Sequence, residues 1–292
     1  MLLGAFMFAA MGVCIKFAAT GYNTFEITAY RGLVGAAFVF GIARANRVSL
    51  RTRRPMMHLW RTVVGSTAMV CSFYAIAHLP LATAMTLNYM SSIWVATFLI
   101  GGALLLQKPG EDMKRQGPLL ATVLAGFGGV ALMLRPTFDS EQLLAGLIGL
   151  ASGLFAALAY LQVSALAKAG EPEARTVFYF SAGAALVGFA GMLGTGASAW
   201  DWASGWWLLP TGVTAALGQL CMTRAYASGA TLLVANLQYF GIVFAVIFSM
   251  LIFSEQLAWQ GWAGMALIVV SAVAATVLRS REAPGTPPPE PD

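Results

Sequence analysis

A few polar and aromatic side chains stand inside long apolar segments of the chain, and any chemistry of the molecule must depend on them. They are amides, phenols and one indole, namely Asn88, Trp94, Tyr160, Gln162, Gln219, Asn236 and Tyr239. Amide and hydroxyl groups exchange hydrogen bonds with a ligand, and aromatic faces stack on rings or on cations. We therefore predict that these seven residues bind a small-molecule substrate.

A catalytic or metal site would require a different set of residues. An enzyme needs a cluster of acids, bases or metal ligands, but the chain has two histidines, no HExxH motif and no Asp or Glu inside an apolar segment. The three cysteines stand within apolar segments and are expected to be free thiols. We predict no catalytic residue, no metal site and no cofactor. A channel is also disfavoured, because neither a ring of charges nor a carbonyl filter motif is visible.

Asn88 and Asn236 occupy matching positions in an internal repeat. A constant offset of 148 residues aligns the segments 77–107 and 225–255, with five identities that include this pair. Each copy belongs to a half with five apolar segments, and because five is odd the second half must enter a membrane from the opposite side. Inverted repeats of this kind are typical of secondary transporters. The two asparagines either bind substrate from opposite halves of a cavity or form interhelical hydrogen bonds, typically worth about 0.6–2 kcal/mol.

The elements that position these residues are predicted to be membrane-spanning helices. Hydrophobic residues make up 59% of the 292 residues and charged residues 10%, whereas a soluble domain carries about 25% charged residues. Ten apolar segments come close to the roughly 20 residues that a membrane helix needs: 2–19, 26–43, 60–78, 82–106, 118–134, 143–167, 175–195, 206–227, 231–253 and 260–279. Their continuous apolar runs differ from the alternating pattern of a membrane barrel.

The predicted fold is an all-α membrane protein with ten transmembrane helices arranged as two inverted five-helix repeats. The first repeat covers residues 1–137 and the second covers residues 138–281. Residues 282–292 are rich in proline and are predicted to form a disordered cytoplasmic tail. Small residues at a spacing of four, such as Gly149 with Gly153 and Gly32 with Ala36, predict close helix packing.

The positive charges predict how the chain crosses the membrane. With a cytoplasmic N-terminus, the inner loops and tail collect twelve Lys and Arg residues, whereas the outer loops hold only Arg135. By the positive-inside rule both termini are cytoplasmic. The basic run Arg44–Arg61 is interpreted as a topology signal and not as a nucleic-acid site. Lys16, Arg31 and Arg224 lie near segment ends and are interpreted as interface anchors, although Lys16 could instead pair with a substrate carboxylate.

The second copy of the repeat carries a recognisable signature. Its segment Ala225–Ala230, with the sequence AYASGA, is followed by an apolar stretch that ends in Phe253-Ser254-Glu255. This pattern resembles that of EamA-type proteins in the drug/metabolite transporter superfamily. Three differences are visible: Gln107 takes the acidic position in the first copy, Ser254 replaces the usual glycine, and the proline often found midway along the helix is absent.

The resemblance covers residues 1–281 and implies a ten-helix secondary transporter. It implies a central cavity enclosed mainly by the first, third, fourth, sixth, eighth and ninth helices, with the fifth and tenth at the periphery. In length and in the overall pattern of apolar and polar residues, the chain is similar to bacterial aromatic amino acid exporters. This similarity implies a location in the bacterial inner membrane. The expected function is export of small metabolites by alternating access, with amino acids favoured and aromatic ones in particular.

Two questions about this function stay open at the level of sequence. Trp94, Tyr160 and Tyr239 could stack on an aromatic amino acid, on an organic cation of a broad drug exporter, or only on neighbouring side chains. The absence of a carboxylate inside a segment gives no support to proton coupling, and facilitated export fits equally well. The expected partners are a small-molecule substrate and the lipid bilayer, without nucleic acid, and the chain is expected to act as a monomer.

Overall fold

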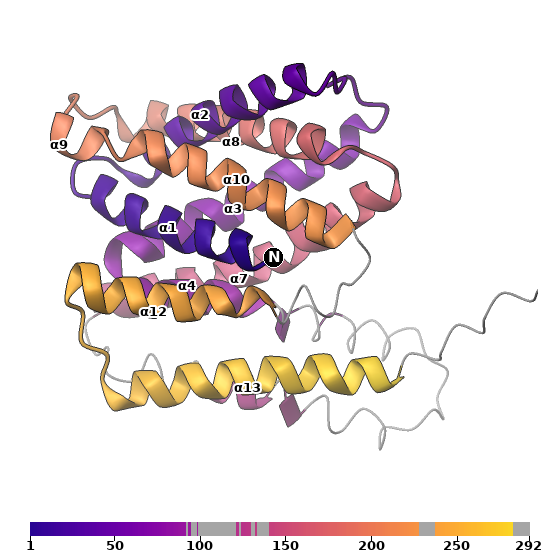
Figure 1. Cartoon of the computed structure of the whole chain (residues 1–292). Coiled ribbons are helices and arrows are strands. Elements are labelled where there is room, and N and C mark those ends of the chain that lie inside the picture. The colour runs from indigo at the N-terminus through magenta and orange to yellow at the C-terminus, as the bar shows by residue number, and fades with distance from the viewer. Residues whose placement is uncertain are drawn as a thin grey trace, which may run out of the picture.

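The computed structural model describes residues 1–91, 93–94, 98, 121–122, 124–129, 132, 140–227 and 237–282. Every regular element in this part of the chain is a helix. The helices are α1 (Leu2–Ala18), α2 (Thr24–Ala45), α3 (Pro55–His78), α4 (Leu81–Tyr89), α7 (Ser140–Lys168), α8 (Glu173–Thr195), α9 (Trp202–Gly205), α10 (Leu208–Ala227), α12 (Phe240–Phe253) and α13 (Trp259–Glu282). The long helices lie side by side in a bundle (Figure 1).

Several of these helices are suited to a membrane. Four are long and apolar enough to cross one, namely α2, α3, α8 and the part of α7 from Gln142 to Lys168, and α1 and α12 are apolar but shorter. Large apolar side chains such as Leu186, Leu193 and Leu251 are exposed on the outside of the bundle, where lipid and not water would surround them. The helical membrane fold is therefore confirmed over the described residues.

The count of ten spanning helices stays a prediction. Several residues of the predicted span 118–134, nearly all of the second half of the span 82–106 and the start of the span 231–253 lie outside the described residues. The same holds for the tail, apart from its first residue, Glu282, which ends α13.

The start of α2 illustrates how local sequence fixes a helix end. Asn23 precedes the helix in extended conformation, and its side chain accepts hydrogen bonds from the backbone N–H groups of Phe25 and Glu26. The Glu26 carboxylate accepts a bond from the Asn23 backbone N–H at 2.7 Å, which completes a capping box. The buried Glu26 also accepts bonds from Ser198, in the segment after α8. This carboxylate therefore serves the helix end and its neighbour, as expected for an acid at a span edge.

Glycine allows the helices to approach closely. The extensive contact of α2 with α8 depends on Gly32 and Gly188, because an added methyl group on either would overlap the backbone of the facing helix. On α7, a methyl group on Gly153 would come within 2.7 Å of the Leu87 carbonyl oxygen of α4. The packing predicted from Gly32 and Gly153 is confirmed.

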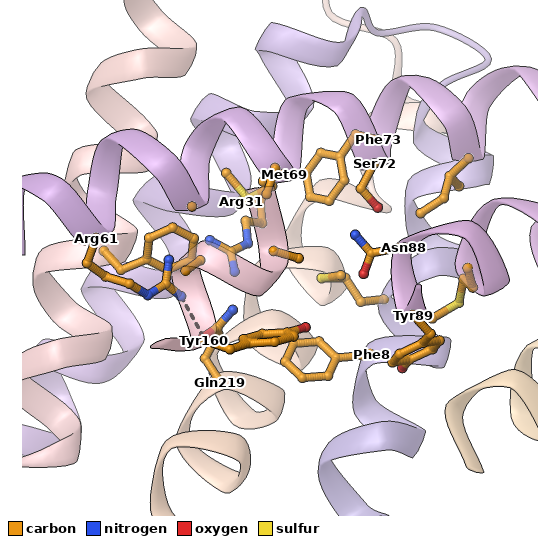
Figure 2. A pocket seen from close by; sticks show the side chains of 18 residues that line it. Phe8, Arg31, Arg61, Met69, Ser72, Phe73, Asn88, Tyr89, Tyr160 and Gln219 are labelled. Carbon is orange, nitrogen blue, oxygen red and sulfur yellow. Dashed lines mark hydrogen bonds between the residues drawn. The ribbon is translucent and has the colours of Figure 1, made fainter. Parts of the chain in front are cut away.

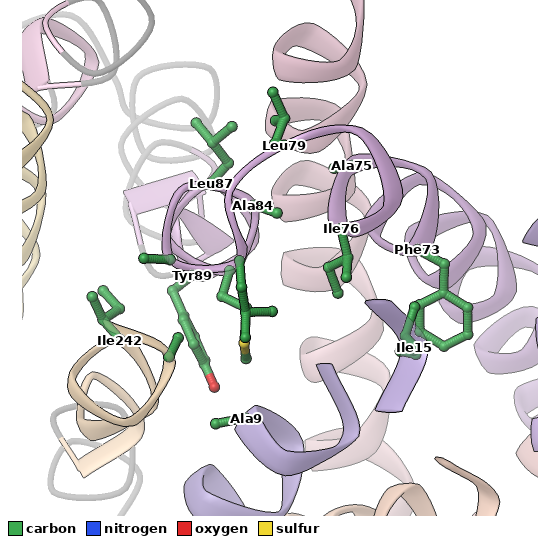
Figure 3. Close-up of a cluster of buried hydrophobic side chains, with 14 of the residues drawn as sticks. Ala9, Ile15, Phe73, Ala75, Ile76, Leu79, Ala84, Leu87, Tyr89 and Ile242 are labelled. Atoms are coloured by element: carbon green, nitrogen blue, oxygen red, sulfur yellow. The ribbon is translucent and has the colours of Figure 1, made fainter. Parts of the chain in front are cut away.

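The main helix pairs follow a regular pattern. α3 packs on α7, α1 packs on α10, and α2 packs on α8. In two equivalent halves, α1 would correspond to α7, α2 to α8 and α3 to α10. Exchanging the halves then converts the α3–α7 pair into the α10–α1 pair and leaves the α2–α8 pair unchanged. This is the pattern that an inverted repeat would produce. The apolar core between α1, α3, α4 and α12 includes Ile15, Phe73, Leu87 and Ile242 (Figure 3).

Candidate substrate-binding cavity

A cavity of about 100 Å³ lies inside the bundle, between α1, α2, α3, α4, α7, α8 and α10. Its wall is largely apolar, and seven of its lining residues carry polar side-chain groups: Arg31, Arg61, Ser72, Asn88, Tyr89, Tyr160 and Gln219 (Figure 2). The helices differ in part from those that the family resemblance implied. Among the described residues, α2 and α8 contribute to the wall and α12 does not. The α2–α8 pair packs against α3 and α10, which also line the cavity.

Three of the seven predicted site residues line this cavity. They are Asn88 on α4, Tyr160 on α7 and Gln219 on α10. The amide nitrogen of Asn88 donates a hydrogen bond to the Ser152 hydroxyl at 3.0 Å, and that hydroxyl donates in turn to the Gly149 carbonyl oxygen at 2.6 Å. Asn88 thus makes an interhelical hydrogen bond between α4 and α7 and also faces the cavity.

The Tyr160 side chain is held in place by two neighbours. Its hydroxyl accepts a hydrogen bond from the Gln238 amide nitrogen at 3.0 Å, and the Gln238 amide oxygen accepts one from the Tyr226 hydroxyl at 3.3 Å. The rings of Tyr160 and Tyr226 stack with 6.0 Å between their centroids. These contacts hold the ring against α10 and the residues just before α12, and the side chain lines the cavity from α7 (Figure 2).

The other predicted site residues do not meet in this cavity. Trp94 packs edge-to-face on Phe127, with 5.0 Å between centroids, and Tyr239 lines an apolar groove between α12 and α13. Gln162 is half-buried and is not part of the cavity wall, because two residues along a helix turn the side chain to the opposite face from Tyr160. Asn236 lies outside the described residues. Of the three aromatic residues predicted to bind substrate, Trp94, Tyr160 and Tyr239, only Tyr160 lines the cavity.

Two arginines in the cavity wall were not among the predicted site residues. Arg31 is 2% exposed and Arg61 is 3% exposed, so the interpretation of Arg31 as an interface anchor is wrong. The interpretation of the basic run as a topology signal fails for Arg61 as well. Its helix begins at Pro55, which places Arg61 almost two turns inside α3. The sequence did contain a signal, since both arginines fall within predicted apolar segments, where a charge is expensive and usually functional.

The two guanidinium groups meet at one aromatic ring. The central guanidinium carbon lies 5.1 Å from the Phe180 ring centroid in Arg31 and 3.9 Å from it in Arg61. The Arg61 side chain folds along α3 over Gly65, where an added methyl group would overlap its guanidinium nitrogen and approach the Phe180 ring to 2.8 Å. A nitrogen of Arg61 also donates a long hydrogen bond, 3.5 Å, to the Gln219 amide oxygen.

Lys16 has a partner within the chain. Its ammonium group forms a salt bridge with Glu255 and donates a hydrogen bond to the Leu79 carbonyl oxygen at 3.0 Å. Glu255 also accepts hydrogen bonds from the Leu81 backbone N–H and the Ser249 hydroxyl. In this conformation Lys16 therefore pairs with a carboxylate of the chain itself, and its interpretation as an interface anchor or as a partner of a substrate carboxylate stays a prediction. Arg224 is exposed, as an interface anchor would be.

A second ionic cluster lies at the opposite end of α3. Glu171, in the turn between α7 and α8, contacts the His58 ring nitrogen at 3.2 Å and accepts hydrogen bonds from Arg175 and Thr52, each at 2.9 Å. Burial acts to raise the pKa of the Glu171 carboxyl, but the bonds from Arg175, His58 and Thr52 and the charge of Arg175 lower this pKa overall. Arg175 also binds the Ser49 carbonyl oxygen. The cluster ties the loop between α2 and α3 to the turn between α7 and α8.

The cavity can therefore bind a ligand through cations, amides and aromatic faces. Within the described residues, no group of three His, Cys, Asp or Glu residues is placed to hold a metal ion. The two ionic clusters lie at the two ends of the bundle and the cavity lies between them.

Three comparisons with known proteins extend this picture. The pseudopaline exporter CntI of Pseudomonas aeruginosa is 34% identical over 277 residues, which is 93% of both chains. An uncharacterized transporter of Helicobacter pylori is 27% identical over 281 residues, covering 93% of this chain and 91% of that one. A solved crystal structure superposes with a TM-score of 0.63 at 21% identity, covering 96% of this chain and 98% of the other, which shows a shared fold.

A family model also matches the first half of the chain. The model of the EamA-like transporter family matches residues 1–134. Since the relative that is 34% identical matches along nearly the whole length, the assignment extends beyond this half. The relatives named above are a pseudopaline exporter and an uncharacterized transporter, so the resemblance is confirmed for the family, and an aromatic amino acid substrate stays a prediction. The chain belongs to the EamA-like transporter family, a family of membrane transporters in the drug/metabolite transporter superfamily.

Proposed function

We propose that this protein is a secondary transporter that exports small metabolites from the cytoplasm by alternating access. Amino acids and related carboxylates are the leading substrate class, with aromatic ones first among the amino acids. The observation that carries the proposal is the cavity inside the bundle, whose wall combines two guanidinium groups, two amides and the face of Tyr160. The export activity named for the Pseudomonas relative supports the direction and the metabolite class.

The size of the cavity supports a change in conformation during transport. A volume of about 100 Å³ holds several water molecules, whereas sites for small molecules have typical volumes of about 300–1,000 Å³. A metabolite as large as an aromatic amino acid therefore needs the walls to separate. The Lys16–Glu255 salt bridge joins α1 to the segment after α12 here, and we propose that it breaks when the cavity opens to that side.

The proposed motion is a rocking of two inverted halves, residues 1–137 and 138–281. The exchange symmetry of the α3–α7 and α1–α10 pairs supports this division. We further propose that the protein lies in the bacterial inner membrane with both termini in the cytoplasm, on the basis of the positive-inside bias.

A broad exporter of organic cations is the second candidate. Such a substrate would need aromatic faces and a counter-charge in the wall. The described wall instead carries two buried cations and no carboxylate, so a second positive charge would be repelled. This observation favours the carboxylate class over the organic cation.

Flux into proteoliposomes tests the proposal. Labelled phenylalanine and glutamate would be offered to vesicles that contain the purified protein, with and without a competing planar cation and a pH gradient. We expect carboxylate flux above that of empty vesicles and no competition by the cation. Asn88→Ala should reduce the flux, whereas the matched control Gln142→Ala, at an exposed position of α7, should not. Absence of flux for every carboxylate, together with cation transport, would replace the leading candidate by the second.

A further inference from the structure

We propose that Arg31 and Arg61 form an anion-binding subsite of the cavity that selects substrates with two carboxylates over zwitterionic amino acids of the same size. The inference rests on the proposed function, because it names the substrate class of the same cavity. It concerns the charge of the substrate, which the comparisons with relatives leave open.

Both arginines have unsatisfied hydrogen-bond donors. In each residue, the Nε and Nη1 atoms are buried without a hydrogen-bond partner. The salt bridges among the described residues involve neither of them. Arginine does not lose its charge in proteins, and a buried charge is costly unless it is paired. The structure therefore contains two permanent cations that lack a counter-ion.

Among the described residues, no carboxylate forms a salt bridge with Arg31 or Arg61. The described carboxylates with resolved contacts serve other sites: Glu26 caps α2, Glu171 binds His58 and Arg175, Asp201 caps α9, and Glu255 binds Lys16. The remaining acidic residues lie outside the ten apolar segments of the sequence. A bound anion would supply the compensating charge at this place.

The geometry allows one small ligand to reach both cations. Both guanidinium carbons lie within 5.1 Å of the Phe180 centroid, so their separation is at most about twice that distance. They come from α2 and α3, and the Phe180 ring comes from α8. Figure 2 places both guanidinium groups beside the same open space as Asn88, Tyr160 and Gln219. A planar guanidinium matches the two oxygens of a carboxylate.

Charge balance then selects the substrate class. A zwitterionic amino acid has no net charge, so it would leave the excess of two positive charges in the cavity unchanged. A second carboxylate gives the substrate a net negative charge that reduces this excess. The amides of Asn88 and Gln219 and the ring of Tyr160 would contact the remaining polar and apolar parts of the molecule. The subsite thus favours a dicarboxylate over its uncharged amide or hydrocarbon counterpart.

Binding to the purified full-length protein in detergent tests this selection without requiring transport. Two matched pairs would be titrated by calorimetry, glutamate against glutamine and 4-carboxyphenylalanine against phenylalanine. We expect the dicarboxylate of each pair to bind at least tenfold more tightly. Equal or tighter binding of the zwitterion in both pairs would overturn the inference. Phosphoserine would be titrated in the same way. If it bound more tightly than either dicarboxylate, the assignment of the subsite to carboxylates would be wrong.

Variants test which residues are responsible. Arg31→Gln and Arg61→Gln should each reduce the preference for the dicarboxylate to within about threefold, and Arg224→Gln, at an exposed position of α10, is the matched control. Gly65→Ala keeps both arginines but displaces the Arg61 guanidinium, so it should weaken dicarboxylate binding in the same direction. An unchanged preference in folded Arg31→Gln and Arg61→Gln proteins would overturn the assignment. If these variants do not fold, the comparison of ligand pairs on the unmodified protein still decides.

Different experimental results would refute the anion-binding subsite and the proposed export function. Vesicles that transport phenylalanine without any preference for dicarboxylates would retain the exporter and remove the subsite. Tight dicarboxylate binding with no flux of any metabolite would retain the subsite and remove the exporter.

Discussion

Charged side chains at the two ends of the bundle form salt bridges, whereas two charged side chains in its centre do not. At one end Lys16 is paired with Glu255, and at the other Glu171 is paired with His58 and Arg175. In the centre, Arg31 and Arg61 are buried as well but have no carboxylate partner among the described residues. Paired charges join helices to one another. The contacts of Arg31 and Arg61 with the Phe180 ring and the long hydrogen bond from Arg61 to Gln219 bring no negative charge to offset the cost of burying two cations. The difference indicates that the ends serve the fold and the centre serves a ligand.

The largest effect is expected from removing both central cations. Arg31→Gln combined with Arg61→Gln should reduce carboxylate flux by about 100-fold or more, because each hydrogen-bonded charge contributes roughly 1.5–3 kcal/mol to binding. Thermal stability should stay the same or rise, since two uncompensated charges are removed. Flux in proteoliposomes and the unfolding temperature of the same preparation check both parts. A large loss of stability would mean that the arginines support the fold.

The Lys16–Glu255 pair should show the reverse pattern. Glu255→Gln leaves the Lys16 ammonium without its counter-charge and should destabilise the protein by about 1–3 kcal/mol. The double variant Lys16→Met with Glu255→Gln should recover part of this loss, because no unpaired charge remains. Thermal unfolding of the two single variants and the double variant forms the required cycle. If the losses in the free energy of unfolding of the two single variants add up to that of the double variant, the two residues are not coupled. The salt bridge would then not stabilise the fold as this comparison assumes.

A smaller effect should appear at acidic pH through Glu171. The folded state lowers the pKa of this carboxyl, so its contribution to stability is present above the unfolded pKa and is lost as the pH falls through the folded pKa. Between pH 7 and pH 4 the unmodified protein should therefore lose more stability than Glu171→Gln, by up to about 1 kcal/mol. Unfolding temperatures across this range provide the measurement. Parallel curves for the two proteins would show that the cluster does not depend on the ionised carboxylate.

The smallest effect is expected for predicted site residues that lie away from the cavity. Trp94→Phe and Gln162→Ala should leave carboxylate flux within about twofold, because an edge-to-face ring contact and a half-buried amide affect packing and not the ligand. Tyr160→Leu is the informative comparison, since Tyr160 lines the cavity from the same helix as Gln162. A strong loss of flux in Trp94→Phe would place the substrate path outside the cavity described above.

The sequence identified more of the fold than of the site. Apolar length and low charge are sufficient to predict membrane helices, because lipid accepts few alternatives to them. The same reasoning found Asn88, Tyr160 and Gln219, since a polar group inside an apolar segment is costly and tends to face an interior path. It misplaced Arg61, because the span was predicted to begin near this residue and α3 begins at Pro55.

The sequence by itself determined that the chain is a helical membrane protein of the EamA type, because hydropathy, charge bias and short motifs act locally along the chain. Only the tertiary structure decided which charges are paired. Lys16 and Glu255 are 239 residues apart and meet in a salt bridge, whereas Arg31 and Arg61 meet at Phe180, a ring from the other half of the chain. A guanidinium group has the same chemistry in an anchor and in a binding site, and its role is fixed by which helices close around it.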